Sequence, residues 1–288
     1  PIAAHQFAPR RRRRFAREQI EEHHAIASQQ GPGDMFDGRG GVWAIVCDNP
    51  DADEPVWSKP RRIWHGVTLN KPIVLKSGEW MMPISLDQRG GFGPFKGCFT
   101  DLDPMRGANV FVSTDEGATW QRRGAATFPD PDWHEHMVVE RKDGSLWMLA
   151  RTSKGLFESV STDGGRTWGE ATPSAIHHPV ARFPLRRLAS GKILLVKHGL
   201  TIDSHDGRSH LTAWLSDDEG KTWSEVKSLP SGLHGDRHKA VYAPDGRLVV
   251  VFRDMGRDSP TRTHFVAWVG RYEDIASGKG YMSRYGFE

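Results

Sequence analysis

Short apolar runs alternate with compact polar segments along most of this chain. The strand-like runs Asn109–Val112, Glu158–Val160 and Leu211–Leu215 are each followed by a segment rich in Ser, Asp, Gly and Thr. Short runs bounded by such turn-forming residues are typical of β-strands joined by tight turns. The pattern therefore predicts an all-β protein built from many short antiparallel strands.

One of the polar segments occurs three times, at residues 113–120, 161–168 and 216–223, with the shared pattern S-x-D-x-G-x-T-W. A repeat with this spacing indicates one supersecondary unit that is used several times. An Asp side chain can accept hydrogen bonds from backbone amides just ahead of it, and Gly can adopt positive φ. We therefore expect the three Asp residues of these segments to stabilise turns and not to act as catalytic acids.

A second kind of turn lies between the repeated segments, and it separates apolar runs such as Met137–Val139 and Leu146–Ala150. Short glycine-containing turns of this kind join antiparallel neighbours. Their central glycines are Gly78, Gly144, Gly191 and Gly246. The order of the two kinds of turn gives four strands per unit, called A to D here, with a hairpin between A and B and a repeated segment between C and D. Four antiparallel strands in a unit of this length are typical of a propeller blade.

The repeated segment is known as the Asp-box or BNR repeat, and on this evidence the chain resembles the sialidase-like superfamily. Three stretches also resemble bacterial BNR-repeat proteins described as exo-sialidase-like: "MFDGRGGVWAIVCDNPDADEPVWSKPRRIWHGVTLNKP", "HEHMVVERKDGSLWMLART" and "RRLASGKILLVKHG". The resemblance covers residues 34–275. It implies a six-bladed β-propeller over residues 34–288, of which about five blades are visible, preceded by an irregular N-terminal segment, residues 1–33. The box does not fix the chemistry, because lyases, other glycosidases and binding proteins carry it too.

Composition adds few constraints. The chain has 288 residues and a net charge of +3, which does not favour a nucleic-acid partner. We interpret the run Arg10 to Arg14 as a solvated tail. No apolar run approaches the ~18 residues of a membrane helix, and the two cysteines give neither a metal-site spacing nor a disulfide framework. The chain begins at Pro1 without an apolar signal segment, so a leader was either removed or never present, and a secreted or periplasmic location is the expectation.

The candidate site follows from blade geometry. The start of strand A and the end of strand B are expected at the mouth of the central channel, on the face opposite the Asp-boxes. Polar side chains converging there from several blades would suit a sugar, and arginines would suit its carboxylate. The candidates, all at or near these strand ends, are Asn70, Lys71, Glu135, His136, Arg151, Arg182, His198, Asp236, Arg237, His238 and Arg253.

Our first hypothesis is a glycoside hydrolase that removes a terminal acidic sugar of the sialic or uronic acid type. Resemblance to sialidases implies three arginines for the substrate carboxylate, an Asp acid/base and a Tyr nucleophile activated by a Glu. The candidate arginines are Arg151, Arg237 and Arg253, with Arg182 or Arg187 as substitutes. Glu135 and Asp236 are the candidate carboxylates for acid/base roles. The N-terminal Arg motif of the family is not visible, and none of the four tyrosines is a secure nucleophile.

Two alternatives stay open. A polysaccharide lyase or histidine-dependent glycosidase acting on uronic-acid polymers would use His136, His198 or His238 as the base, with Tyr242 as an acid. A non-catalytic glycan-binding propeller would keep the arginines but would need no paired acid and base. In each case the partner is an anionic glycan or polysaccharide. No cofactor, metal or membrane span is implied, and the oligomeric state is not given.

Overall fold

The computed structural model of the protein describes most of the chain from Gly41 onward and three residues before it. The described residues are 14–16, 41–47, 52–68, 70–86, 97, 99–130, 135–188, 190–208, 210–224, 227–228, 235–255, 259–271, 274 and 281–283. Regular structure in these ranges consists of β-strands, one short 3-10 segment, η3 (Thr100–Met105), and the helical residue Asp274. The prediction of an all-β protein is confirmed.

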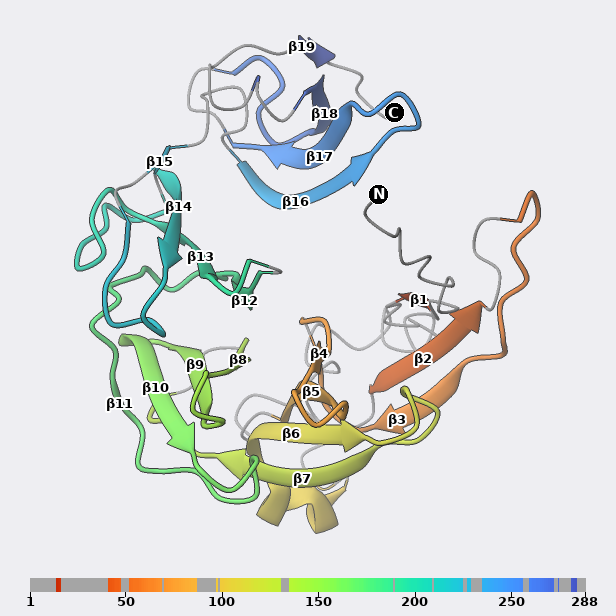
Figure 1. The fold of residues 1–288 in the computed structure, drawn as a ribbon, viewed down its shortest axis with the longest axis vertical. Helices are drawn as coiled ribbons and strands as arrows, with labels where there is room; N and C mark the ends of the chain where they lie inside the picture. The colour runs from red at the N-terminus through yellow and green to blue at the C-terminus, as the bar shows by residue number, and fades with distance from the viewer. Residues whose placement is uncertain are drawn as a thin grey trace, which may run out of the picture. The chain divides into compact units, whose positions relative to one another are not determined.

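The described strands form five sheets, and each sheet is made of strands that are consecutive in the sequence (Figure 1). The first contains β1 (Arg14–Ala16), β2 (Val42–Cys47) and β3 (Arg61–Trp64). The second contains β4 (Ile73–Val74), β5 (Trp80–Leu86), β6 (Gly107–Ser113) and β7 (Gln121–Ala126). The third contains β8 (Met137–Glu140), β9 (Leu146–Thr152), β10 (Gly155–Ser161) and β11 (Thr172–Pro173).

The last two sheets also have four strands each. The fourth contains β12 (Leu185–Arg187), β13 (Ile193–His198), β14 (Leu211–Ser216) and β15 (Lys227–Ser228). The fifth contains β16 (Gly235–Tyr242), β17 (Leu248–Asp254), β18 (Phe265–Gly270) and β19 (Tyr281–Ser283). The expected unit of four antiparallel strands therefore recurs four times in the described part of the chain.

The hairpins between the first two strands of these units form where the sequence predicts them. Their central glycines all have φ between 79° and 88°, a conformation that strains residues with a side chain. In each hairpin the amide of this glycine donates to the carbonyl three residues earlier, as Gly78 does to Leu75 at 2.8 Å. The four glycines are Gly78, Gly144, Gly191 and Gly246.

The N-terminal segment contributes to the first sheet. Arg14–Ala16 pairs antiparallel with β2, so that Phe15 lies opposite Val46. The chain divides into two compact units, one of residues 1–152 and 158–172 and the other of residues 153–157 and 173–288. The boundary between an N-terminal segment and a propeller after residue 33 stays a prediction.

In the first unit, consecutive sheets pack against each other through the repeated turns. The guanidinium of Arg61 in β3 donates to the carbonyl of Gly117, in the turn of the second sheet, at 3.0 Å. Gly124 in β7 lies so close to the turn of the third sheet that an added Cβ would be 2.3 Å from the carbonyl oxygen of Gly165. Each of these turns therefore packs against the outer strand of the preceding sheet. Apolar side chains fill the space between the first and second sheets: Val42, Ile63, Trp64, Met82, Ile84, Phe111 and Trp120.

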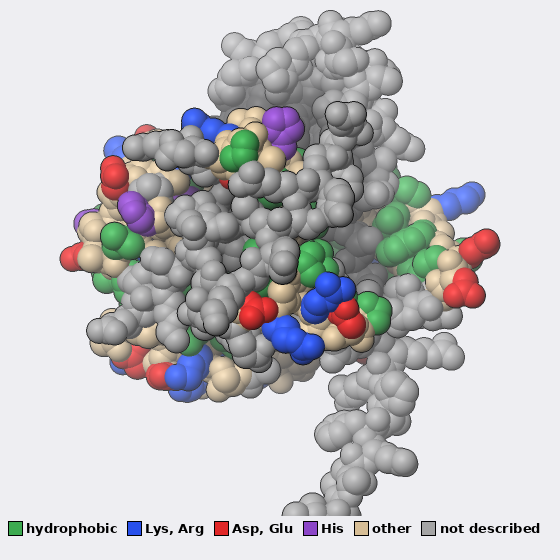
Figure 2. All heavy atoms as spheres, turned by 90° about the horizontal axis from the view of Figure 1, so that it is seen from above, with side chains coloured by type: hydrophobic (Ala, Val, Ile, Leu, Met, Phe, Trp, Pro, Cys, Tyr) green, Lys and Arg blue, Asp and Glu red, His purple; other side chains and the backbone are tan. Residues whose placement is uncertain are grey.

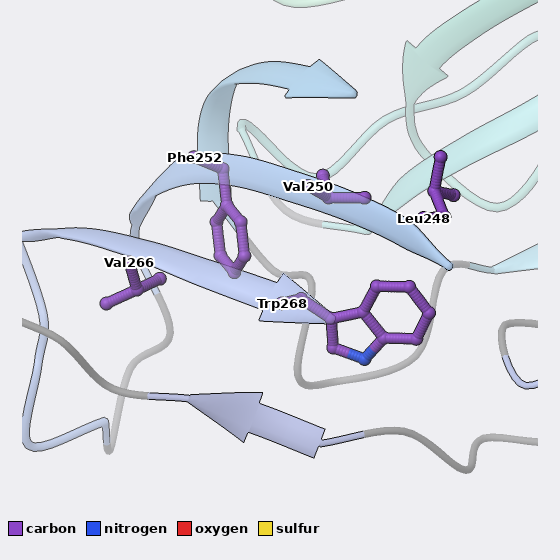
Figure 3. Close-up of a cluster of buried hydrophobic side chains, with 5 residues drawn as sticks. All are labelled: Leu248, Val250, Phe252, Val266 and Trp268. Carbon is purple, nitrogen blue, oxygen red and sulfur yellow. The ribbon is translucent and has the colours of Figure 1, made fainter. Parts of the chain in front are cut away.

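In the second unit, burial alternates along the strands with the period of two that a half-buried strand requires. In β17 buried and half-buried residues alternate throughout, and β18 follows the same rule. The buried residues of the two strands form one apolar cluster, drawn in Figure 3: Leu248, Val250, Phe252, Val266 and Trp268.

On the face shown in Figure 2, the described Lys and Arg side chains lie interspersed with the described Asp and Glu side chains. Over the described residues, no helix has the length and apolarity needed to cross a membrane.

Candidate functional site

The two ends of each four-stranded sheet differ in what they carry. In the second sheet Ser113, which begins the repeated turn, is paired with Trp80 at the start of β5. The end of β5 is paired instead with the start of β6, where Leu86 lies opposite Gly107. We call the end with the hairpin and the repeated turn the box end, and the opposite one the far end. The candidate residues at the end of each sheet's second strand therefore lie at the far end, as the sequence predicts.

At the box end, each repeated turn is held by its own Asp. In the first turn the hydroxyl of Ser113 donates to Asp115 at 2.7 Å, and Thr119 donates its amide at 2.8 Å and its hydroxyl at 2.6 Å to the same carboxylate. Corresponding bonds to Asp163 and Asp218 recur in the other two turns. The expectation that these Asp residues stabilise turns is confirmed.

These hydrogen bonds favour the ionised carboxylates. The Thr119 side chain and amide, with Ser113, lower the pKa of Asp115 to about 2. Thr222 lowers the pKa of Asp218 to about 2 in the same way. Groups that stay ionised under ordinary conditions are unsuited to donate a proton in catalysis.

At the far end of the third sheet, Glu135 and Arg151 form an ion pair. The Arg151 Nη1 atom lies 2.7 Å from Glu135 Oε2, and the two side chains are only 11% and 8% exposed. Strand β8 pairs with β9 so that Met137 lies opposite Leu149, and two more residues along this register bring Glu135 opposite Arg151. A guanidinium held in this way is oriented in advance for a second planar anion such as a carboxylate.

Two other candidates, Asn70 and His136, stabilise the segment that contains Glu135. The Asn70 amide donates to the carbonyl of His136 at 2.8 Å. The His136 ring, which is 1% exposed, donates from Nε2 to the carbonyl of Asn109 at 2.8 Å. Both side chains are buried and both bind backbone carbonyls. Their observed contacts therefore fix the position of Glu135 against the second sheet.

The far end of the fifth sheet repeats the pairing of an acid with an arginine. Asp236 in β16 and Arg253 in β17 are register partners, next to the pair Gly235 and Asp254. Arg237 and His238 follow in β16, whose backbone but not whose side chains the structure describes. Two sheets thus place a carboxylic residue opposite an arginine at the same end.

One candidate arginine lies at the wrong end of its sheet for the predicted role. Arg187 donates to the carbonyl of Gly191 in the hairpin at 2.7 Å and forms an ion pair with Glu219 in the repeated turn. It is therefore at the box end, whereas His198 of the same sheet is paired with Leu211 at the far end. These contacts do not favour a place for Arg187 in the substrate cluster, which stays a prediction. Lys71 and Arg182 are exposed residues that precede the first strands of their sheets.

The repeated turns and the sheets they join agree with what a family comparison finds. The model of the BNR repeat-like domain matches residues 51–242, which is more than half of the chain. The protein belongs to the BNR repeat-like family. The resemblance to the sialidase-like superfamily, stated from the sequence, is also confirmed by the relatives of the chain.

Among the relatives of this BNR repeat-like protein is a sialidase of Micromonospora viridifaciens, which is 32% identical over 50% of this chain and 27% of the sialidase. A xyloglucanase of a Paenibacillus species is 25% identical over 54% of this chain and 17% of that enzyme. The chain thus spans about a quarter or less of the length of these curated relatives. Both relatives are glycoside hydrolases.

The fold is shared with solved sialidase structures. A Hadza microbial sialidase superposes with a TM-score of 0.53 at 20% identity, covering 86% of this chain and 47% of the other. At this identity the likeness concerns the fold and carries no information on the residues of the site.

Two buried polar residues of the BNR repeat-like chain were not singled out from the sequence. Lys197 is fully buried, and its Nζ atom donates to the carbonyls of Thr201 at 2.6 Å and Ser204 at 2.9 Å. Burial lowers its pKa to about 8. His178, in the segment before β12, is 2% exposed and lies beside His198, with ring centroids 5.5 Å apart. Lys197 directly precedes the candidate His198 in the sequence. His178 lies on a connection before β12, and the strand pattern does not specify the path of that connection.

Proposed function

We propose that this protein is a glycoside hydrolase that releases a terminal acidic sugar, of the sialic or uronic acid type, from an anionic glycan. The observation that carries the proposal is the buried pair of Glu135 and Arg151 at the far end of the third sheet. An isolated buried ion pair is a weak contributor to stability, and ionisable groups in perturbing surroundings cluster at functional sites. Membership of a family with glycoside hydrolase relatives supplies the class of chemistry.

In this proposal Arg151 binds the carboxylate of the sugar, and Glu135 keeps its guanidinium in the orientation that the substrate needs. Arg253, opposite Asp236 in the fifth sheet, is a second cationic candidate, together with Arg237. Most glycoside hydrolases use two carboxyl groups, one of which donates a proton to the leaving oxygen. Glu135, paired with Arg151, is our candidate for one of the two carboxyl groups, and Asp236 is our candidate for the acid.

The architecture that would bring these residues together is a six-bladed propeller over residues 34–288. It is supported by the way the first three sheets follow one another, each repeated turn packing on the preceding sheet. In such a ring the far ends of all blades would surround one channel. An experimental structure of the full chain tests this arrangement, because an open or linear stack of sheets would leave the two carboxylates without a shared substrate.

The test of the function is the pair of variants Glu135→Gln and Glu79→Gln. Glu79 forms an ion pair of the same chemistry with Arg123, at the box end of the second sheet. We expect Glu135→Gln to lower kcat on an acidic aryl glycoside by about 100-fold or more. Glu79→Gln should leave kcat unchanged. Equal effects of the two variants would contradict the proposed site.

The substrates tested should separate the acidic sugars from a neutral one. Aryl glycosides of N-acetylneuraminic acid and glucuronic acid represent the two acidic types, and xyloglucan represents the neutral substrate named for the Paenibacillus relative. We expect turnover of one acidic glycoside and none of xyloglucan, because a guanidinium buried with a single carboxylate favours an anionic ligand. Turnover of xyloglucan alone would overturn the acidic-sugar assignment.

A further inference from the structure

Three buried polar residues join the second and third sheets beside Glu135. Asn70 precedes β4, Asn109 lies in β6 and His136 precedes β8. Their exposed fractions are 7%, 0% and 1%. Burying polar side chains costs free energy unless they are hydrogen-bonded, and bonded networks of this kind hold a region rigid. We call Asn70, Asn109 and His136 the buried polar cluster.

The ring of His136 is a hydrogen-bond donor toward the second sheet. Its Nε2 atom lies 2.8 Å from the carbonyl oxygen of Asn109, and a carbonyl can only accept, so Nε2 carries the hydrogen. A general base must reach the proton that it removes, and this ring is almost fully buried. The observed geometry therefore suits a link between the two sheets better than an acid or a base.

Asn109 supplies the carbonyl group that accepts this bond. Its side-chain Nδ2 atom donates to the carbonyls of Met105 at 2.9 Å and Gly107 at 3.0 Å. Its Oδ1 atom accepts from Nε of Arg122 in β7 at 2.6 Å. Both ends of the side-chain amide are thus bonded, so the backbone of Asn109 is fixed to the end of η3, to the start of β6 and to the neighbouring β7.

Asn70 holds the segment of Glu135 from a second direction. Its Nδ2 atom donates to the carbonyl of His136 at 2.8 Å and lies 3.5 Å from that of Glu135. The residue that follows Glu135 is therefore held twice, through its ring and through its carbonyl. The Glu135 carboxylate accepts from Nη1 of Arg151 at 2.7 Å, so this ion pair forms from a backbone whose position the cluster sets.

We propose that the buried polar cluster positions the carboxylate of Glu135 for catalysis, and that His136 acts as a positioning residue and not as an acid or base. The catalytic use of Glu135 rests on the proposed function, whereas the cluster rests on its own hydrogen bonds. A displacement of about 1 Å in a reacting group can lower a rate by roughly 100-fold. The proposal also opposes the alternative in which His136 is the base of a lyase.

The first test compares two substitutions of His136. The side-chain amide in His136→Gln can still donate to the carbonyl of Asn109, whereas the side chain in His136→Leu cannot. On the acidic aryl glycoside that the protein hydrolyses, we expect His136→Leu to lower kcat by roughly tenfold or more, and His136→Gln to restore most of that loss. The pH profile of kcat/KM should keep its shape in His136→Gln. Equal losses in the two variants, with one limb of the pH profile missing, would overturn the proposal in favour of an acid or base.

Asn109 and Ser113 provide a matched comparison within one strand. Both lie in β6 and are buried, but Ser113 is at the box end, where its hydroxyl oxygen accepts from the amide of Gly117 at 2.7 Å. Asn109→Leu and Ser113→Ala each remove buried hydrogen bonds, so both should lower the thermal stability. Only Asn109→Leu should lower kcat of the folded protein, and Asn70→Leu takes its place if that variant does not fold. An unchanged kcat in the folded variant would show a purely structural role and overturn the proposal.

A double variant shows whether His136 acts through Glu135. In the Glu135→Gln background, adding His136→Leu should lower kcat little further, because the group that His136 positions has already been removed. If the two losses multiply instead, the residues act independently and the positioning role is wrong.

The stability of the same variants separates this inference from the proposed function. Urea denaturation of the single and double variants measures the coupling of His136 with Glu135 without any substrate. Coupling in a protein that hydrolyses neither the N-acetylneuraminic acid nor the glucuronic acid glycoside would retain the contact of the cluster with Glu135 and overturn the hydrolase. Hydrolysis that Glu135→Gln abolishes and His136→Leu leaves unchanged would retain the hydrolase and overturn the positioning role.

Discussion

The box end and the far end of the sheets carry charged groups in opposite settings. At the box end Asp115 is exposed, and its hydrogen bonds come from Ser113 and Thr119 within the same turn. At the far end Glu135, which precedes β8, is buried, and its partner Arg151 belongs to β9. A turn Asp is satisfied locally in any copy of the turn, whereas Glu135 depends on the tertiary register.

This difference shows which charges are part of the repeat and which are particular to one place in the protein. The turn Asp recurs in three sheets with the same donors. The far-end groups differ from sheet to sheet and include a pair of charges, a buried lysine and a buried histidine. Burying such groups costs free energy unless they are paired, and perturbed ionisable groups cluster at functional sites.

The largest effect should come from breaking the far-end pair. Arg151→Met leaves the carboxylate of Glu135 buried without its cation, and we expect the free energy of unfolding to fall by roughly 3 kcal/mol. Urea denaturation measures the loss. Arg123→Met, which breaks the more exposed pair with Glu79 at the box end, should cost clearly less.

A double variant shows whether the loss belongs to the pair. Combining Arg151→Met with Glu135→Gln removes both charges, so most of the lost stability should return. Equal destabilisation by Arg151→Met and Arg123→Met would remove the distinction between the two ends.

The buried amine of Lys197 should make the stability of the protein depend on pH in the alkaline range. Its pKa is lowered from 10.5 to about 8 by burial. Between these values the unfolded chain binds a proton that the folded protein has lost, so stability should rise as the pH increases from 8 to 10.5. Melting temperatures of the protein and of Lys197→Met across this range test the point, since their difference isolates this group. A difference that does not change with pH would show that the amine stays protonated.

The sequence is sufficient to predict the parts of the fold that are determined locally. The repeated turns and the hairpin glycines are set by side chains and φ values within a few residues, so each copy can be recognised by itself. The contact of Glu135 with Arg151 was also within reach, because each lies eight residues from Asp143 at the hairpin. Residue type marks each of them as a candidate, whereas the pairing follows only from the symmetry about the hairpin.

The remaining features depend on tertiary structure. Arg187 resembles the other candidate arginines in type, and only the register shows that it lies near Gly191 and Glu219 at the box end. His178 lies on a connection between sheets, and its burial results from packing against Phe183 and His198. No pattern of apolar and polar positions specifies such a contact.

The turn Asp residues at the box end should make the stability of the protein depend on pH in the acid range. The folded pKa of Asp115 and Asp218 is about 2, against 3.8 for the free side chain. Their contribution to stability is therefore complete above the free value and is lost as the pH falls toward 2. Asp115→Asn and Asp218→Asn should each reduce the loss of thermal stability measured between pH 4 and pH 2, with kcat at neutral pH unchanged. A neutral-pH loss of turnover in a folded variant would contradict a purely structural role.

The smallest effect is expected for Arg187→Met, and it is the sharpest test of the comparison. Arg187 and Glu219 are 27% and 17% exposed, so their ion pair should contribute at most about 1 kcal/mol to stability. Because the pair lies at the box end, the affinity for an acidic sugar should not change, whereas Arg151→Met should weaken it at least tenfold. Isothermal titration of both variants with the same sugar decides the matter. If Arg187→Met weakened binding as much as Arg151→Met, residue type would predict the site better than position in the sheet, and the separation of the two ends would fail.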